Sequence, residues 1–261
     1  GRIGAAKTRW LARADVVASL ADCQAFADGA PLPTCTKLSS LLAHDSARDF
    51  VRGWFAEMMP AWRDNPLAHM PFRHSFSGGV GAMQLFRVGP ATLSLLVINP
   101  VGIGPARTIA FTDCERHEVV LAGQGRAIAY SFSDGGPPSG SALQLRPGAR
   151  FHGHAERSRA IVQLDAPLVL LRLTREPERP APTRQVEIAS GRIVHRASAS
   201  PAEGRAELAA ALVGAMGRTD AAPALARYAC GQEGEGERWQ ALRNALALDT
   251  RVGFEALCRI A

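Results

Sequence analysis

Two histidines near the middle of the chain have the spacing of a ligand pair. His152 and His154 are separated by one residue, so on a strand both side chains would point to the same face. His117 or Glu118 could supply a third donor from a neighbouring strand. Two or three imidazoles and a carboxylate suit a divalent Fe, Mn, Ni or Zn ion. The alternative is an exposed strand end with solvated histidines.

Arginines next to these residues would change the kind of ligand. Because a guanidinium pairs bidentately with carboxylate or phosphate, an inward-pointing Arg116 or Arg126 would favour an anionic ligand. Glu118 follows Arg116 by two residues and therefore lies on the same strand face. We predict ligand binding by Arg116, Glu118, Arg126 and His152, and metal ligation by His117, Glu118, His152 and His154. The alternative for the run 115–118 is a charged edge that discourages strand pairing.

The cysteines and the glycine-rich stretches add no clear chemistry. Cys114 could be a nucleophile or a redox thiol, but the sequence fixes no partner base, which favours a buried structural thiol. The five cysteines are scattered and form no C-x-x-C, which argues against a disulfide framework and a zinc ribbon. Motifs for phosphate loops, for a G-x-S-x-G elbow and for H-E-x-x-H are absent. No residue is assigned a catalytic role.

The composition is that of an ordinary globular protein. Of the 261 residues, 47% are apolar and 21% are charged. The net charge of +6 comes from arginines spread among acidic residues, whereas nucleic-acid binders more often have a basic run or helix face, so nucleic-acid binding is disfavoured. No apolar stretch of about 18 residues occurs, and the N-terminus has no apolar signal-peptide core. We therefore expect a cytoplasmic protein without membrane contact.

Short apolar runs separated by turn residues occupy the middle of the chain. These runs are 83–88, 91–98, 107–111, 117–121, 126–132, 142–145, 159–164 and 168–173. Strands at this spacing are typical of an all-β sandwich or barrel. Because no helical pattern of about 10 to 15 residues falls between them, a parallel βαβ sheet is disfavoured.

Helical patterns flank the strand region on both sides. Residues 9–60 have apolar side chains at helical spacing, and a second helix there is expected to end at Pro60 and Pro66. Residues 201–261 indicate about four short helices, the last two packing through apolar residues, with a helix-turn-helix as the alternative for that pair. We therefore predict an α+β protein: a helical segment at 1–71 packing on the barrel, an antiparallel β-barrel or sandwich at 72–197, and a helical bundle at 198–261.

Two separated motifs lie in the strand region, V-L-A-G-Q-G at 120–125 and R-P-G-A-R-F-H-G-H at 146–154. In this order, with a strand and a glycine-rich loop between them, they resemble the two halves of a cupin, a jelly-roll barrel of the RmlC-like type. The family has His and Glu metal ligands before the first motif, but the usual glutamate position here holds Arg116. The resemblance thus implies a divergent cupin with a degenerate metal site. The layout is also similar to that of HutD-type two-cupin proteins.

The resemblance implies a small-molecule-binding protein whose ligand lies inside the barrel. One alternative is a metal-dependent cupin enzyme of the dioxygenase or isomerase type, and another is a transcriptional regulator with a cupin sensor. We make no commitment to catalysis. Because cupins commonly pair through strands, the resemblance also implies a homodimer.

Overall fold

The structure is a computed structural model that describes all residues except 1, 134–135, 198–200, 232–234 and 261. The chain forms two compact units. The first comprises Gly1–Arg179 with Val186–Arg192, and the second comprises Pro180–Gln185 with Ile193–Ala261. Within the described residues, no helix is both long enough and apolar enough to cross a membrane. The division predicted at residues 71 and 197 stays a prediction.

Four helices begin the first unit. They are α1 (Arg2–Leu11), α2 (Ala14–Ala27), α3 (Thr36–Leu41) and α4 (His44–Asp64), with a short 3-10 turn at Leu32–Thr34. Pro60 was expected to end the last of them, but α4 continues through it to Asp64, before Pro66. Trp54, Met58 and Ala61, on both sides of this proline, are buried. Their packing stabilises the final turn despite the missing backbone donor.

The strands form antiparallel sheets. Their bounds are β1 (His74–Ser77), β2 (Val80–Val88), β3 (Ala91–Ile98), β4 (Thr108–Phe111), β5 (Glu115–Ala122), β6 (Gly125–Ser131), β7 (Ser139–Leu145), β8 (Arg150–Gly153), β9 (Arg157–Leu164), β10 (Leu168–Arg175), β11 (Thr183–Glu187) and β12 (Ile193–Ala197). A six-stranded sheet has the order β1-β2-β3-β10-β5-β8, and a three-stranded sheet has the order β7-β6-β9. These two sheets pack as a sandwich, and no closed barrel is formed by the described strands.

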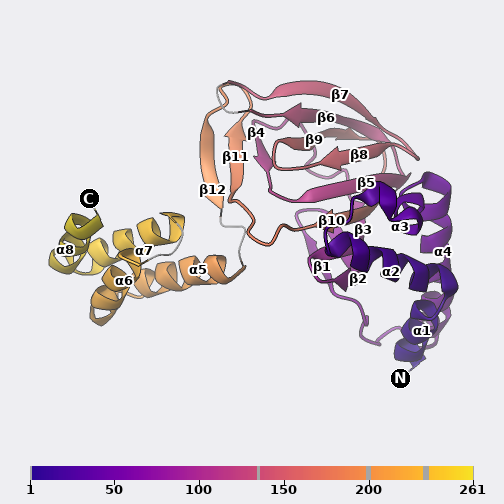
Figure 1. Cartoon of the computed structure of the whole chain (residues 1–261), viewed down its shortest axis with the longest axis horizontal. Coiled ribbons are helices and arrows are strands. Elements are labelled where there is room, and N and C mark those ends of the chain that lie inside the picture. Colours follow the sequence, from indigo (N-terminus) through magenta and orange to yellow (C-terminus); the bar gives the residue numbers. More distant parts are fainter. Residues whose placement is uncertain (1, 134–135, 198–200, 232–234, 261) are drawn as a thin grey trace. The chain divides into compact units, whose positions relative to one another are not determined.

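The six-stranded sheet is covered on both faces, and this determines where its polar residues can lie. On one face, Val119 and Leu171 pack with Trp10 and Trp54 of the N-terminal helices. On the other face, Val120 joins residues of β6, β7 and β9 in a second cluster of buried apolar side chains. Figure 1 shows the helices and the three-stranded sheet on opposite sides of it. Alternate residues of β5 and β10 therefore face the helices or the sandwich interior.

Helices make up most of the second unit. They are α5 (Pro201–Ala215), α6 (Ala222–Ala229), α7 (Glu235–Leu248) and α8 (Thr250–Ile260), with a 3-10 turn at Thr219–Ala221. Small side chains such as Ala229, Ala241 and Ala245 are buried where α6, α7 and α8 meet, together with Leu242. The predicted fold class, α+β with an antiparallel sandwich and helices before and after it, is confirmed.

Candidate ligand and metal sites

Strand β5 presents charged residues to both faces of the six-stranded sheet. Its register pairs Glu118 with Phe151 of β8 and Arg172 of β10, and pairs His117 with His152 and Leu173. Because neighbouring side chains on a strand point to opposite faces, Glu118 is directed into the sandwich and His117 toward the N-terminal helices. The predicted metal ligands His117 and Glu118 are therefore separated by the sheet.

Three arginines surround the Glu118 carboxylate inside the sandwich. Arg159 Nε donates to Oε2 at 2.7 Å, Arg172 Nε donates to Oε1 at 2.6 Å, and Arg116 Nε lies 3.9 Å from Oε1. The Glu118 side chain is 2% exposed. Burial opposes its ionisation, but Arg159, Arg172 and Arg116 outweigh burial and lower the pKa of Glu118 to about 2. Glu118 is thus a charged acceptor held by arginines.

The space beside Glu118 is almost filled. Phe151 stacks with the guanidinium groups of Arg116, Arg157 and Arg159, whose Cζ atoms lie 5.6, 5.8 and 5.6 Å from the ring centre. The cavity that Glu118 lines with Phe151 has a volume of about 10 Å³. This is about the space that one water molecule requires. This small cavity, which Arg159 lines but Arg116 and Arg172 do not, therefore has no room for a larger molecule.

On the opposite face, β5 and β8 bring three donor groups together. Glu115, His117 and His152 each offer one ligand atom, and these atoms lie within 4.8 Å of one another. His117 Nε2 donates to Glu115 Oε1 at 2.8 Å, and Arg175 Nη2 donates to Glu115 Oε2 at 2.5 Å. Arg175 also donates to the carbonyl oxygens of Phe26 and Ala30, which fixes this arginine against the end of α2.

The donor set of these three residues fits a divalent transition metal. Two imidazoles and one carboxylate are the ligands that Zn, Fe, Ni and Mn sites use. The rings of His117 and His152 are stacked, with centres 4.4 Å apart and an angle of 6° between planes. Since nitrogen lone pairs lie in the ring plane, the exposed His152 has to turn before both rings can bind one ion.

The protonation states at this triad favour ligation. Burial raises the pKa of Glu115, but the His117 hydrogen bond and the Arg175 charge outweigh it, so that this pKa lies below its usual value. Burial and the neighbouring His117 lower the pKa of His152. A charged carboxylate and a neutral imidazole are the states that bind metals.

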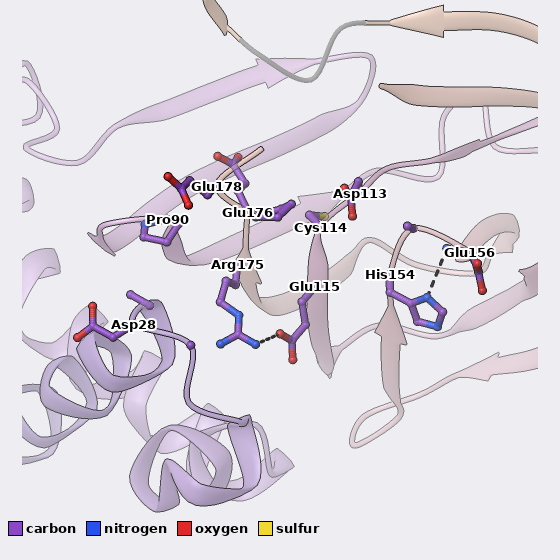
Figure 2. Close-up of a pocket in the computed structure, with 14 residues that line it drawn as sticks. Asp28, Pro90, Asp113, Cys114, Glu115, His154, Glu156, Arg175, Glu176 and Glu178 are labelled. Carbon is purple, nitrogen blue, oxygen red and sulfur yellow. Dashed lines mark hydrogen bonds and ion pairs between the residues drawn. The ribbon is translucent and has the colours of Figure 1, made fainter. Parts of the chain in front are cut away.

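A large open cavity adjoins the triad. Its volume is about 930 Å³, and Glu115 and Arg175 line it (Figure 2). The acidic residues of its lining are Asp28, Asp113, Glu115, Glu156, Glu176 and Glu178. Arg175 is the one arginine among the described residues of the lining, and Figure 2 shows it paired with Glu115. The lining is therefore negative although the whole chain carries a net charge of +6.

The remaining predicted site residues lie in different places. Arg126 is on β6, exposed, and donates to Gln163 on the neighbouring β9. His154 lines the large cavity, and its ring lies 5.7 Å from that of His152. Cys114 lines the same cavity, and burial raises the pKa of its thiol, which disfavours the thiolate. The structure thus brings the rings of His117, His152 and His154 close together. Arg126 and Glu118 lie apart from these three histidines.

Sequence reasoning missed Glu115 as a metal ligand, and it missed Arg159 and Arg172. The signal for Glu115 was present, because a residue two positions before His117 shares its strand face. Arg159 and Arg172 are 41 and 54 residues from Glu118 in the sequence. Only the packing and pairing of the strands bring these two arginines close to Glu118.

Comparison with known proteins finds distant structural matches only. No family model and no curated protein matches the sequence. Among solved structures, CapF from Staphylococcus aureus matches with 13% identity and a TM-score of 0.33, over 49% of this chain and 34% of CapF. HutD from Pseudomonas fluorescens matches with 16% identity and a TM-score of 0.31, over 42% of this chain and 58% of HutD. The resemblance to cupins stays a prediction, because both TM-scores are below 0.5.

A putative mannose-6-phosphate isomerase from Ralstonia eutropha also matches, with 14% identity and a TM-score of 0.30, over 39% of this chain and 88% of that one. The matches to CapF and HutD leave a third or more of each of those proteins uncovered. With TM-scores of 0.30 to 0.33, these matches say nothing about the activity of this chain.

Proposed function

We propose that this protein is a cupin-like small-molecule-binding protein with a divalent metal ion held by Glu115, His117 and His152. The observation that supports this proposal is the convergence of three ligand atoms within 4.8 Å on the helix-facing side of β5 and β8. Two of the three residues, His117 and His152, were predicted as metal ligands from the sequence. The third, Glu115, replaces Glu118, whose carboxylate is taken up by arginines.

The adjoining cavity provides the place for the small molecule. Binding sites for small molecules commonly measure about 300 to 1,000 Å³, and the cavity at Glu115 has about 930 Å³. Because its lining is acidic, the ligand that fits best carries a positive charge or reaches the site as a metal complex. A ligand in this cavity would meet the metal at Glu115.

Metal titration of chelator-treated protein tests the proposal. We expect one Zn²⁺ or Co²⁺ per chain by calorimetry, and absorption bands of bound Co²⁺ in the visible range. Glu115→Gln and His152→Asn should each weaken binding at least about tenfold, since each removes one of three ligands. His69→Asn is the matched control, because His69 is an exposed histidine in the same unit. The metal affinity of the His69→Asn variant should equal that of the unchanged protein.

Two results would contradict the proposal. One is the absence of metal binding by protein whose circular dichroism shows an intact fold. The other is unchanged affinity in both ligand variants. In the bound state, proton NMR should also show a changed environment for the rings of His117 and His152, because their stacked arrangement has to open.

A metal-dependent enzyme is the second candidate function. It is favoured by one observation, the position of Glu115 in both the triad and the lining of the open cavity. A metal at this position would supply a Lewis acid, and Glu115 and Arg175 would orient a molecule in the cavity. Turnover that requires added metal and is lost in Glu115→Gln would identify an enzyme, whereas binding without turnover would leave a binding protein.

We also propose a homodimer, as the resemblance to cupins implies. Light scattering at several protein concentrations should give twice the mass of the chain. A mass of one chain at every concentration would refute this proposal.

A further inference from the structure

Inside the sandwich, arginines outnumber the carboxylates that face them. Arg116, Arg159 and Arg172, here called the arginine cluster, converge on Glu118. Their side chains are 21%, 6% and 27% exposed, and that of Glu118 is 2% exposed. In the ion pairs of the described residues around Glu118, three positive charges meet one negative charge, which leaves an excess of two positive charges in a largely buried place. Buried charge of this kind is costly unless a counter-charge is bound.

Arg116 is the member of the cluster with the fewest partners. Its Nε atom is buried and has no hydrogen-bond partner, and the nearest oxygen of Glu118 is 3.9 Å away. Burial lowers the pKa of Arg116, while Glu118 opposes this effect. A buried N–H group without an acceptor is destabilising, and more so when the group is charged. An additional acceptor would therefore be bound here.

The backbone leaves room for the Arg116 side chain. Gly153 of β8 is paired with Arg116, and a β-carbon at Gly153 would lie 2.9 Å from Arg116 Nη2. Phe151 supports the same guanidinium from its ring face. Arg116 is thus held in a defined position by a glycine and an aromatic ring.

We propose that the arginine cluster binds the phosphate group of a small molecule. A phosphate monoester carries between one and a half and two negative charges at about pH 7, which matches the two uncompensated positive charges. The partly exposed Arg116 and Arg172 meet the phosphate from the solvent side, because guanidinium groups pair bidentately with phosphate oxygens. Glu118 positions Arg159 and Arg172 through its two short hydrogen bonds.

This phosphate site is separate from the proposed metal site. The cluster lies on the interior face of the six-stranded sheet, whereas Glu115 and His117 lie on the helix-facing side of β5. A failure of one proposal therefore leaves the other standing. The two can be measured on the same protein, one with phosphate and one with metal.

Inorganic phosphate is the first probe, with phenyl phosphate as a monoester. Calorimetry and thermal unfolding are carried out at constant ionic strength, with sodium chloride replacing phosphate in the reference. We expect phosphate to raise the unfolding temperature more than chloride does. Arg116→Gln should weaken phosphate binding about tenfold or more, because it removes a charge-assisted bidentate contact.

Arg126→Gln is the matched control. Arg126 is an exposed arginine of β6 that donates to Gln163, so the same change in net charge occurs away from the cluster. Its phosphate affinity should stay within about twofold of the unchanged protein, since exposed charges at a distance are screened by salt. Arg116→Lys is a second variant in case Arg116→Gln does not fold. It retains the charge, loses the bidentate geometry and should also bind phosphate more weakly.

Three results would overturn the inference. Chloride at equal ionic strength could protect the protein as well as phosphate does. Folded Arg116→Gln or Arg116→Lys could bind phosphate with unchanged affinity. Acetate, a single negative charge, could bind as tightly as phosphate, which would contradict the match to two charges.

Discussion

Replacement of Glu118 by glutamine should be the most damaging change of a single charge in the first unit. The substitution keeps the shape of the side chain, removes its negative charge and turns one of its two acceptor oxygens into a donor NH2 group, so three guanidinium groups lose their shared counter-charge. Removing one partner of a buried ion pair costs about 3 to 5 kcal/mol. We expect Glu118→Gln to lower the free energy of unfolding by about this amount at pH 7.

The pKa of Glu118 gives a second estimate of the same quantity. It falls from 4.5 to about 2 on folding. Since a tenfold change in an equilibrium constant corresponds to about 1.4 kcal/mol, the charged form is favoured in the folded protein by about 3 kcal/mol. Because the folded-state pKa is the lower one, this stabilisation is present above pH 4.5 and is lost as the pH falls toward 2. The Glu118→Gln variant should not show this loss of stability below pH 4.5, because its side chain does not titrate.

Urea unfolding followed by tryptophan fluorescence measures both effects. The chain has four tryptophans, and Trp10, Trp54 and Trp62 lie in the first unit. A Trp239→Phe background therefore restricts the signal to that unit. Glu178→Gln is the matched control, because Glu178 is exposed. The reasoning is refuted if Glu118→Gln unfolds within about 1 kcal/mol of the background protein at pH 7, or if both show the same loss of stability below pH 4.5.

Two further substitutions test the packing around the sites. Gly123→Ala should lower the free energy of unfolding by about 2 kcal/mol or more, because Gly123 has φ of +89° and its β-carbon would meet the Pro167 carbonyl oxygen. Gly104→Ala, with nothing within 4 Å of its β-carbon, should have little effect in the same urea titration, and an equal loss in the two variants would argue against the close approach. Leu171→Ala, at a residue with 0% exposure between the sheet and the helices, should cost about 2 to 5 kcal/mol. Leu67→Ala, at a residue with 96% exposure, should cost little, and similar midpoints for the two leucine variants would contradict the assigned core.

The strands were predictable because turn residues separate them. The apolar runs at 117–121, 126–132 and 168–173 lie within or beside β5, β6 and β10, and Gly123 provides the left-handed backbone between β5 and β6. The helices before and after the strands followed from their apolar spacing. The division of the described strands into three sheets did not follow, because pairing between distant strands leaves no local pattern.

The direction of the β5 side chains was the main gap in the prediction. A strand that is buried on both faces has no alternation of polar and apolar residues. The run from Glu115 to Glu118 is wholly charged or histidine, and Val119 to Leu121 is wholly apolar. Neither run reveals which residues face the interior. Once the covering helices are known, the alternation assigns Glu118 and His117 to opposite faces.

Because β5 directs His117 and Glu118 to opposite faces of the sheet, the length of this strand is restricted in related chains. A deletion or insertion of one residue inside β5, between Glu118 and Val119, would send the histidine inward and the carboxylate outward, exchanging the environments of both at once. Changes of two residues would preserve the assignment of faces. Related chains that retain both sites should therefore keep the spacing within β5, and an odd change in length inside this strand without a compensating bulge would mark a chain that has lost them.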